Sequence, residues 1–186
     1  MRPAPLAEGE LCIGVSIAVP APYGAQLADA RARFRDPAAS LIPPHVTLLG
    51  PTTVRRDDLT AVDAYLTAVA ARHRSFDLRL AGAATFRPIS PVTFVQVVEG
   101  GPACAALADE VRTGPLAQDL RFEYHPHVTV AQGVDDDLLD AAQAGMADYV
   151  AEFSVTGFSR YEHGADGLWR PARTFGLAAG LAARPV

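Results

Sequence analysis

The chain has 186 residues, of which 49% are hydrophobic and 20% are charged, and its formal net charge is −5. This length supports one domain with a sizeable core, and the composition is that of an ordered globular protein. The negative net charge argues against a protein that mainly holds long nucleic acid by its phosphates. It does not exclude a small anionic ligand in a local basic pocket.

Cys12 and Cys104 are the only cysteines, and neither lies in a metal-binding or redox motif. Two free thiols are typical of a reducing cytoplasm, where we expect the protein to be located. The apolar run at 11–19 follows Glu8 and Glu10, whereas a secretory signal begins with basic residues. The run is also too short to span a bilayer, so we interpret it as a buried strand and expect no membrane partner.

The first half of the chain alternates strands and helices. The strand just described is followed by a helix over 22–35, in which apolar residues recur every three or four positions. A proline-rich loop then leads to a short strand at 45–49. One of the aspartates at 57–58 is expected to cap a second amphipathic helix, and a strand is predicted near 75–86.

The second half repeats this order. A strand is predicted at 92–99, and a glycine- and proline-containing turn leads into another amphipathic helix. After a loop comes a second short strand that begins at His127. Three aspartates at 135–137 favour the positive end of a fourth helix. Two closing strands, near 150–161 and 168–178, flank a final turn.

The tetrapeptide Pro-His-Val-Thr occurs at 44–47 and again at 126–129. Each copy follows a strand, a helix and a proline-containing loop, and each precedes another helix and strand. This order predicts two pseudo-symmetric halves rather than a solenoid, because the repeat is too long for the latter. We expect a single domain over 1–186. Its first lobe is about 11–86, completed by closing strands from the C-terminus, and its second lobe is about 91–161.

The repeated tetrapeptide carries the candidate catalytic groups. Alternate side chains of a strand point to the same face, so His45 projects with Thr47, and His127 with Thr129. If the halves face each other, one neutral imidazole can accept a proton while a charged one donates a proton across a phosphorus centre. The threonine hydroxyls can donate hydrogen bonds to the phosphate oxygens. This set indicates phosphoester cleavage without a metal or another cofactor.

The segments PPHVTLLGP and HPHVTVAQ resemble the two H-x-T-x motifs of the two-histidine phosphoesterases. That superfamily includes 2′-5′ RNA ligase-like proteins and cyclic nucleotide phosphodiesterases. The resemblance extends over about 11–178 and includes the order of the segments. It implies a bilobal α+β fold of the LigT-like kind, in which two antiparallel-rich sheets form a central groove with helices outside. It also implies hydrolysis or formation of 2′-linked phosphodiesters.

By motif position, the resemblance assigns catalytic roles to His45 and His127 and phosphate binding to Thr47 and Thr129. Several members of the superfamily carry a basic residue just after the second motif. Here the sequence continues Ala-Gln-Gly over 131–133. A cationic phosphate contact is therefore expected from another part of the chain, and we consider four arginines for this role: Arg87, Arg121, Arg160 and Arg170.

Three other aromatic side chains are candidates either for contact with a base or for ordinary packing. Phe86 and Tyr124 are candidates for stacking on a base or for packing at the rim of the groove. Trp169 is a candidate for the same two roles. We expect His125 at the rim or exposed, and not as a zinc ligand, because too few other ligands lie near it in sequence. The last two histidines are expected on the surface: His73 near a helix end and His163 in an exposed turn.

The sequence therefore predicts a phosphoesterase that acts on nucleoside 2′,3′-cyclic phosphates or on 2′-5′ linkages of small nucleotides or RNA ends. We expect a monomer that binds this nucleotide or RNA terminus as its substrate and does not have long nucleic acid as its main partner. Two identical motifs do not show which histidine is the base, and the same machinery in reverse would be an RNA ligase. The alternatives are a catalytically inactive nucleotide or RNA-end binding module, a metal-dependent hydrolase, and two histidines with purely structural roles.

Overall fold

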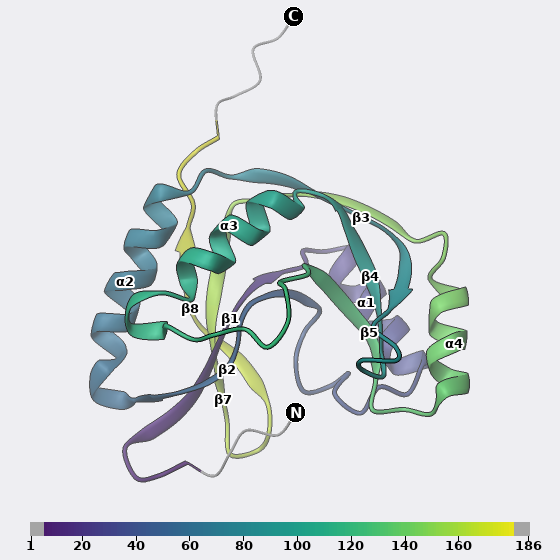
Figure 1. Ribbon diagram of the computed structural model, residues 1–186, viewed down its shortest axis with the longest axis horizontal. Coiled ribbons are helices and arrows are strands. Elements are labelled where there is room, and N and C mark those ends of the chain that lie inside the picture. The colour runs from purple at the N-terminus through teal and green to yellow at the C-terminus, as the bar shows by residue number, and fades with distance from the viewer. Residues whose placement is uncertain (1–5, 181–186) are drawn as a thin grey trace, which may run out of the picture.

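The computed structural model describes residues 6–180, which form two four-stranded antiparallel sheets flanked by four α-helices (Figure 1). In order across it, the first sheet consists of β2 (His45–Arg55), β1 (Glu10–Ala18), β7 (Gly157–His163) and β8 (Trp169–Gly176). The second consists of β5 (His127–Gln132), β4 (Val92–Glu99), β3 (Phe76–Thr85) and β6 (Val150–Val155). The two strands that begin with the motif histidines thus occupy equivalent sheet edges, and the predicted bilobal α+β fold is confirmed.

The helices are α1 (Tyr23–Arg33), α2 (Leu59–Arg72), α3 (Gly101–Val111) and α4 (Asp136–Gly145). Figure 1 shows α2 and α4 on opposite flanks of the molecule, where α2 packs against β8 and α4 against the second sheet. The other two helices cross between the halves, since α1 packs against β5 and α3 against β2. Within the described range, no helix has the length and apolar character needed to cross a membrane.

The apolar stripes predicted from the sequence form one continuous core. Leu27 and Ala30 of α1 are buried, as are Leu66 of α2 and Leu107 of α3. The motif strands contribute alternate residues to the same cluster, namely Val46, Leu48, Val128 and Val130, all fully buried. Because strand side chains alternate in direction, burial of these four fixes the opposite direction for the histidines and threonines between them.

Two strands lie in different sheets from those predicted. β3 was expected in the first lobe, but it pairs with β4 and β6 in the second sheet. The run predicted as one strand at 150–161 divides at Thr156 into β6, in the second sheet, and β7, which pairs with β1 in the first. The chain changes sheets at Gly157, where a Cβ atom would lie 2.6 Å from the Phe175 carbonyl oxygen. The boundaries predicted for both lobes therefore differ from the observed pairing.

The start of α2 also differs in detail from the prediction. Asp58 occupies the N-cap position, but its side chain makes no capping hydrogen bond. A short 3-10 turn, Arg56–Asp58, leads into the helix instead. The fourth helix begins as predicted, with Asp135 at the N-cap and two more aspartates in its first turn.

A buried ion pair fixes the loop that leads into the first motif. Arg31 Nε donates a hydrogen bond to an Asp36 carboxylate oxygen at 2.9 Å, and its Nη1 donates to the Ile42 carbonyl at 2.8 Å. The other Asp36 carboxylate oxygen accepts the Ala38 N–H at 2.8 Å. Since both charged side chains are buried, each depends on the other for its stability in the core.

We predict that Asp36→Ala lowers the free energy of unfolding by about 3–5 kcal/mol, because it leaves the Arg31 guanidinium buried without its partner. Urea denaturation measures this change. The matched control is Asp57→Ala, which removes an exposed pair with Arg55 and should cost about 0–1 kcal/mol. Equal losses for the two variants would contradict the role assigned to the buried pair.

Candidate active site

The two motif strands, β2 and β5, contact each other across the boundary between the sheets. They show the same alternation of burial over their first six residues, with the histidine and the threonine of each copy only partly buried. Besides burial, which is the main cause, and the charge of Arg31, the charge of a protonated His127 lowers the pKa of His45, so the two rings lie within range of each other's charge. The fold therefore brings the four predicted motif side chains to one region of the molecule.

Each motif histidine is oriented by the backbone carbonyl two residues before it. His45 Nδ1 lies 2.8 Å from the Pro43 carbonyl oxygen, and His127 Nδ1 lies 2.7 Å from that of His125. Because a carbonyl oxygen only accepts hydrogen bonds, Nδ1 must be the protonated nitrogen in both rings. The neutral rings thus keep an unprotonated Nε2 that can accept a proton from a substrate or from water.

Burial lowers the pKa of both rings. For His45 the pKa falls from its usual 6.5 to about 4; burial is the main cause, and nearby Arg31 and His127 add smaller contributions. Burial also lowers the pKa of His127, and the ring of His125 adds to this effect. In each case the hydrogen bond to the backbone carbonyl offsets part of the fall. Without a bound anion, both rings are therefore neutral at pH 7.

The motif threonines differ from the backbone beside them, because hydrogen bonds hold the backbone at Thr47 and Leu48. Within residues 6–180, neither Thr47 nor Thr129 has a side-chain hydrogen bond to another residue. The Tyr124 hydroxyl donates to the Thr47 carbonyl at 2.8 Å. Arg112 stacks on the Tyr124 ring at 4.8 Å and donates from Nη1 to the Leu48 carbonyl at 2.7 Å. These contacts join β2 to the second half of the chain.

Tyr124 and Phe86, the two residues considered for base stacking, occupy different surroundings. The Tyr124 ring is covered by Arg112, and burial raises the pKa of its hydroxyl, which stays protonated as a donor. Phe86 stands edge-on to the His127 ring, with centroids 4.9 Å apart at 89°. It also contacts His125 and Phe94, and sequence analysis did not single out Phe94. These four rings form an aromatic wall beside the second motif.

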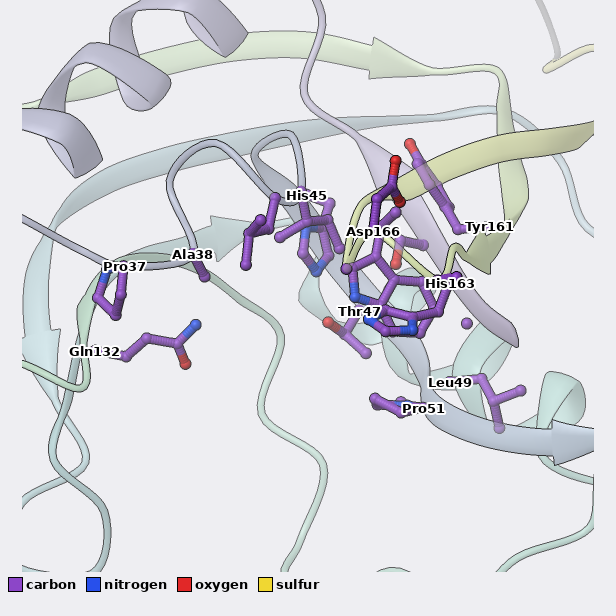
Figure 2. Close-up of a pocket in the computed structure, with 18 of the residues that line it drawn as sticks. Pro37, Ala38, His45, Thr47, Leu49, Pro51, Gln132, Tyr161, His163 and Asp166 are labelled. Atoms are coloured by element: carbon purple, nitrogen blue, oxygen red, sulfur yellow. The ribbon is translucent and has the colours of Figure 1, made fainter. Parts of the chain in front are cut away.

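A pocket of about 880 Å³ opens beside the first motif. Figure 2 shows His45 and Thr47 near its middle, with His163 and Tyr161 on one side and Gln132 of β5 on the other. Trp169 and Ser16 also line it. His163 was expected in an exposed turn, so its place in the pocket is a difference from that expectation. Ser16, Tyr161 and Gln132 were missed.

Strand register explains part of what sequence analysis missed. Ser16 lies directly opposite Thr47 in the β1–β2 ladder, and Tyr161 lies opposite Gly14 in the β1–β7 ladder. Both belong to the sheet face beside the first motif. The alternation of Ser16 with apolar neighbours is visible in the sequence, but the strand pairing that places Ser16 and Tyr161 next to the motif is not.

Three of the arginines considered for phosphate binding are paired with carboxylates. Arg87 binds Asp136 and Asp140, Arg160 binds Asp63 and Glu162, and Arg170 binds Asp166. The fourth, Arg121, stacks on Phe122 at 5.2 Å. No side chain of the four lines the pocket. The arginine nearest in effect to the motif is Arg31, which was not among the candidates. Next to burial, its charge lowers the pKa of His45.

The other histidines lie outside the motif pair. His73 binds Glu110 through Nε2 at 2.6 Å, at the end of α2, which fits the predicted position near a helix end. His125 belongs to the aromatic wall. Among residues 6–180, no three or more His, Cys, Asp or Glu side chains are grouped so that they could hold a metal ion.

Comparisons with known proteins identify the family of the chain. A family model of the 2′-5′ RNA ligase superfamily matches residues 19–167. A protein of Bacillus cereus (strain B4264) that carries the provisional name of phosphoesterase is 28% identical over 149 residues, which cover 78% of this chain and 85% of that protein.

Solved structures show the same fold. The crystal structure of E. coli LigT complexed with 3′-AMP has a TM-score of 0.70 at 21% identity and covers 90% of this chain and 98% of LigT. The LigT structure with NADP⁺ has a TM-score of 0.66 at 21% identity, with the same coverage. Since the family model matches most of its length, this chain belongs to the 2′-5′ RNA ligase superfamily.

Proposed function

We propose that the protein is a metal-independent phosphodiesterase acting on nucleoside 2′,3′-cyclic phosphates or on 2′-5′ linkages of small nucleotides or RNA ends. His45 and His127 are its general acid–base pair, and Thr47 and Thr129 bind the phosphate. The observation that carries the proposal is the contact between β2 and β5, which each present an imidazole with an unprotonated Nε2. The E. coli LigT structures complexed with 3′-AMP and with phosphate support a small phosphorylated ligand.

The proposed reaction needs one neutral and one protonated ring. The neutral ring takes a proton from water as the water oxygen bonds to phosphorus, and the protonated ring gives its proton to the departing ribose oxygen. A cyclic phosphate thereby becomes a phosphomonoester, and the two rings exchange protonation states. The threonine hydroxyls stabilise the negative charge on the non-bridging oxygens.

Binding of the anionic substrate favours protonation of one of the two rings. Both histidines are neutral at pH 7 in the free protein because burial lowers their pKa values. A phosphate anion placed between them favours the charged form of a ring and so raises its pKa. Binding is therefore expected to bring one proton into the groove.

We predict that His45→Ala and His127→Ala each lower kcat/KM for nucleoside 2′,3′-cyclic phosphates by about 10²- to 10⁴-fold, because each removes one proton-transfer group. Product formation is measured in excess chelator, with circular dichroism as the folding check. His73→Ala serves as the control, since His73 lies at the end of α2, bound to Glu110. Wild-type turnover by either motif variant, or loss of all activity in chelator, would refute the mechanism.

We also predict a bell-shaped dependence of kcat/KM on pH, with its maximum below pH 6.5. The active free enzyme holds one proton on the pair, and the maximum lies midway between the two apparent pKa values. Since both histidine pKa values are lowered, that midpoint lies on the acid side of 6.5. The maximum of kcat should lie at higher pH, because bound phosphate raises the pKa of the acid. A kcat/KM maximum above pH 7 is the contrary result.

A further inference from the structure

We infer that the pocket beside the first motif is a nucleobase site, in which the base stacks on Trp169 next to His163. The nucleoside part of the ligand then lies over β1, β7 and β8, and its phosphate reaches His45 and Thr47. The inference rests on the proposed function for the phosphoester attached to the nucleoside. It adds the position and the chemistry of base recognition.

Trp169 is held rigidly in place. Its backbone N–H donates to the Leu41 carbonyl at 2.8 Å, which fixes the start of β8 to the loop before the first motif. Its ring lies over Gly14 of β1, where a Cβ atom would be only 3.3 Å from Cζ3 of the indole. The glycine thus leaves room for the indole against the sheet. A preorganised aromatic surface of this kind loses little entropy when a base stacks on it.

His163 supports the indole from the neighbouring strand. It is paired with Trp169 in the β7–β8 ladder, and the two rings meet edge to face, with centroids 5.0 Å apart at 61°. Both side chains are only partly buried, and both line the pocket. Aromatic side chains bind bases through their π faces. Stacking of one base accounts for a large part of the binding free energy of a small ligand.

The pocket has the size and the polar groups that a nucleoside requires. Its volume of about 880 Å³ lies within the range of small-molecule sites. The polar residues Ser16, Tyr161 and Gln132 are among those that line it, and side chains of these types pair with the edges of a base or with ribose hydroxyls. His45 and Thr47 line the same pocket, so one mononucleotide can contact both regions.

The two halves are not equivalent in this respect. At the second motif, Phe86, Phe94 and His125 pack against His127 and one another. Apart from Gln132, every residue that lines the pocket comes from the first sheet or from the loops beside it. The broken symmetry therefore favours a single nucleoside on the side of the first motif.

Trp169 is the only tryptophan of the chain, so its fluorescence reports directly on this pocket. Titration with adenosine 2′-monophosphate should quench the emission in a saturable way. Inorganic phosphate and ribose 5-phosphate, which lack a base, should leave it unchanged. Equal quenching by the base-free phosphates would overturn the inference. So would nucleotide binding detected by calorimetry without quenching, or no nucleotide binding at all.

A kinetic comparison separates this inference from the proposed function. Trp169→Ala should raise KM for adenosine 2′,3′-cyclic phosphate roughly 5- to 100-fold, the loss expected when one stacked base loses its partner. Turnover of glycerol 1,2-cyclic phosphate, which has no base, should stay near the wild-type value and shows that the variant is folded. Trp169→Phe should recover part of the affinity, and Phe122→Ala should match wild type, because Phe122 is 56% exposed and outside the pocket.

Equal losses on both substrates, or no loss on either, would refute base stacking while leaving the phosphodiesterase proposal intact. The opposite failure is also distinguishable. If wild type hydrolyses neither cyclic phosphate but adenosine 2′-monophosphate still quenches Trp169, the proposed reaction is wrong and the nucleobase site stands.

Discussion

The contact between the motif strands β2 and β5 is the constraint on which the candidate site depends. Each strand lies at the edge of its own sheet, and each is packed by a helix from the other half of the chain. Tyr124 and Arg112 add hydrogen bonds to the carbonyls of Thr47 and Leu48, so the backbone of β2 is tied to the second half. Backbone hydrogen bonds and the buried valines and leucines thus hold β2 and β5 in place. The motif histidine and threonine side chains do not belong to this packing and are only partly buried.

Orientation of the imidazoles by carbonyls rather than carboxylates has a chemical consequence. A neutral carbonyl selects the Nδ1–H tautomer, as the aspartate of a Ser-His-Asp triad does, but it stabilises the imidazolium much less. Burial lowers the pKa of both histidines, and the hydrogen bond to the carbonyl offsets only part of that fall. In the proposed mechanism the charge of the phosphate thus sets the protonation of the rings, and ligand binding and acid–base readiness are coupled.

The sequence was sufficient to predict features that depend on local patterns. The repeated tetrapeptide, the order of elements and the apolar stripes predicted the duplicated fold, and the alternation around Val46 and Val128 predicted the face on which the motif side chains lie. Features that depend on pairing between distant strands were not predictable. The pattern at 150–161 fits one long strand, and only the pairing of β6 with β3 and of β7 with β1 shows where the chain changes sheets.

The surroundings of the motifs were missed for the same reason. Arg87 and Arg160 carry the positive charge that phosphate binding requires. Both are paired with aspartates 49 or more positions away in sequence, so this charge is neutralised. Arg31 was not considered because nothing local separates a buried arginine from an exposed one on a helix. The pocket residues Ser16 and Gln132 likewise derive their position from strand register.

The backbone of the two halves is nearly symmetric, whereas the side chains are not: two imidazoles are oriented alike, and a pocket lies beside only the first of them. The proposed mechanism requires that both imidazoles reach the same phosphorus centre. A crystal structure of the protein with vanadate or phosphate tests it directly. The account predicts one anion whose oxygens lie about 2.7–3.2 Å from Nε2 of both His45 and His127. An anion that contacts only one of these rings, with the other turned away at a longer distance, would contradict it.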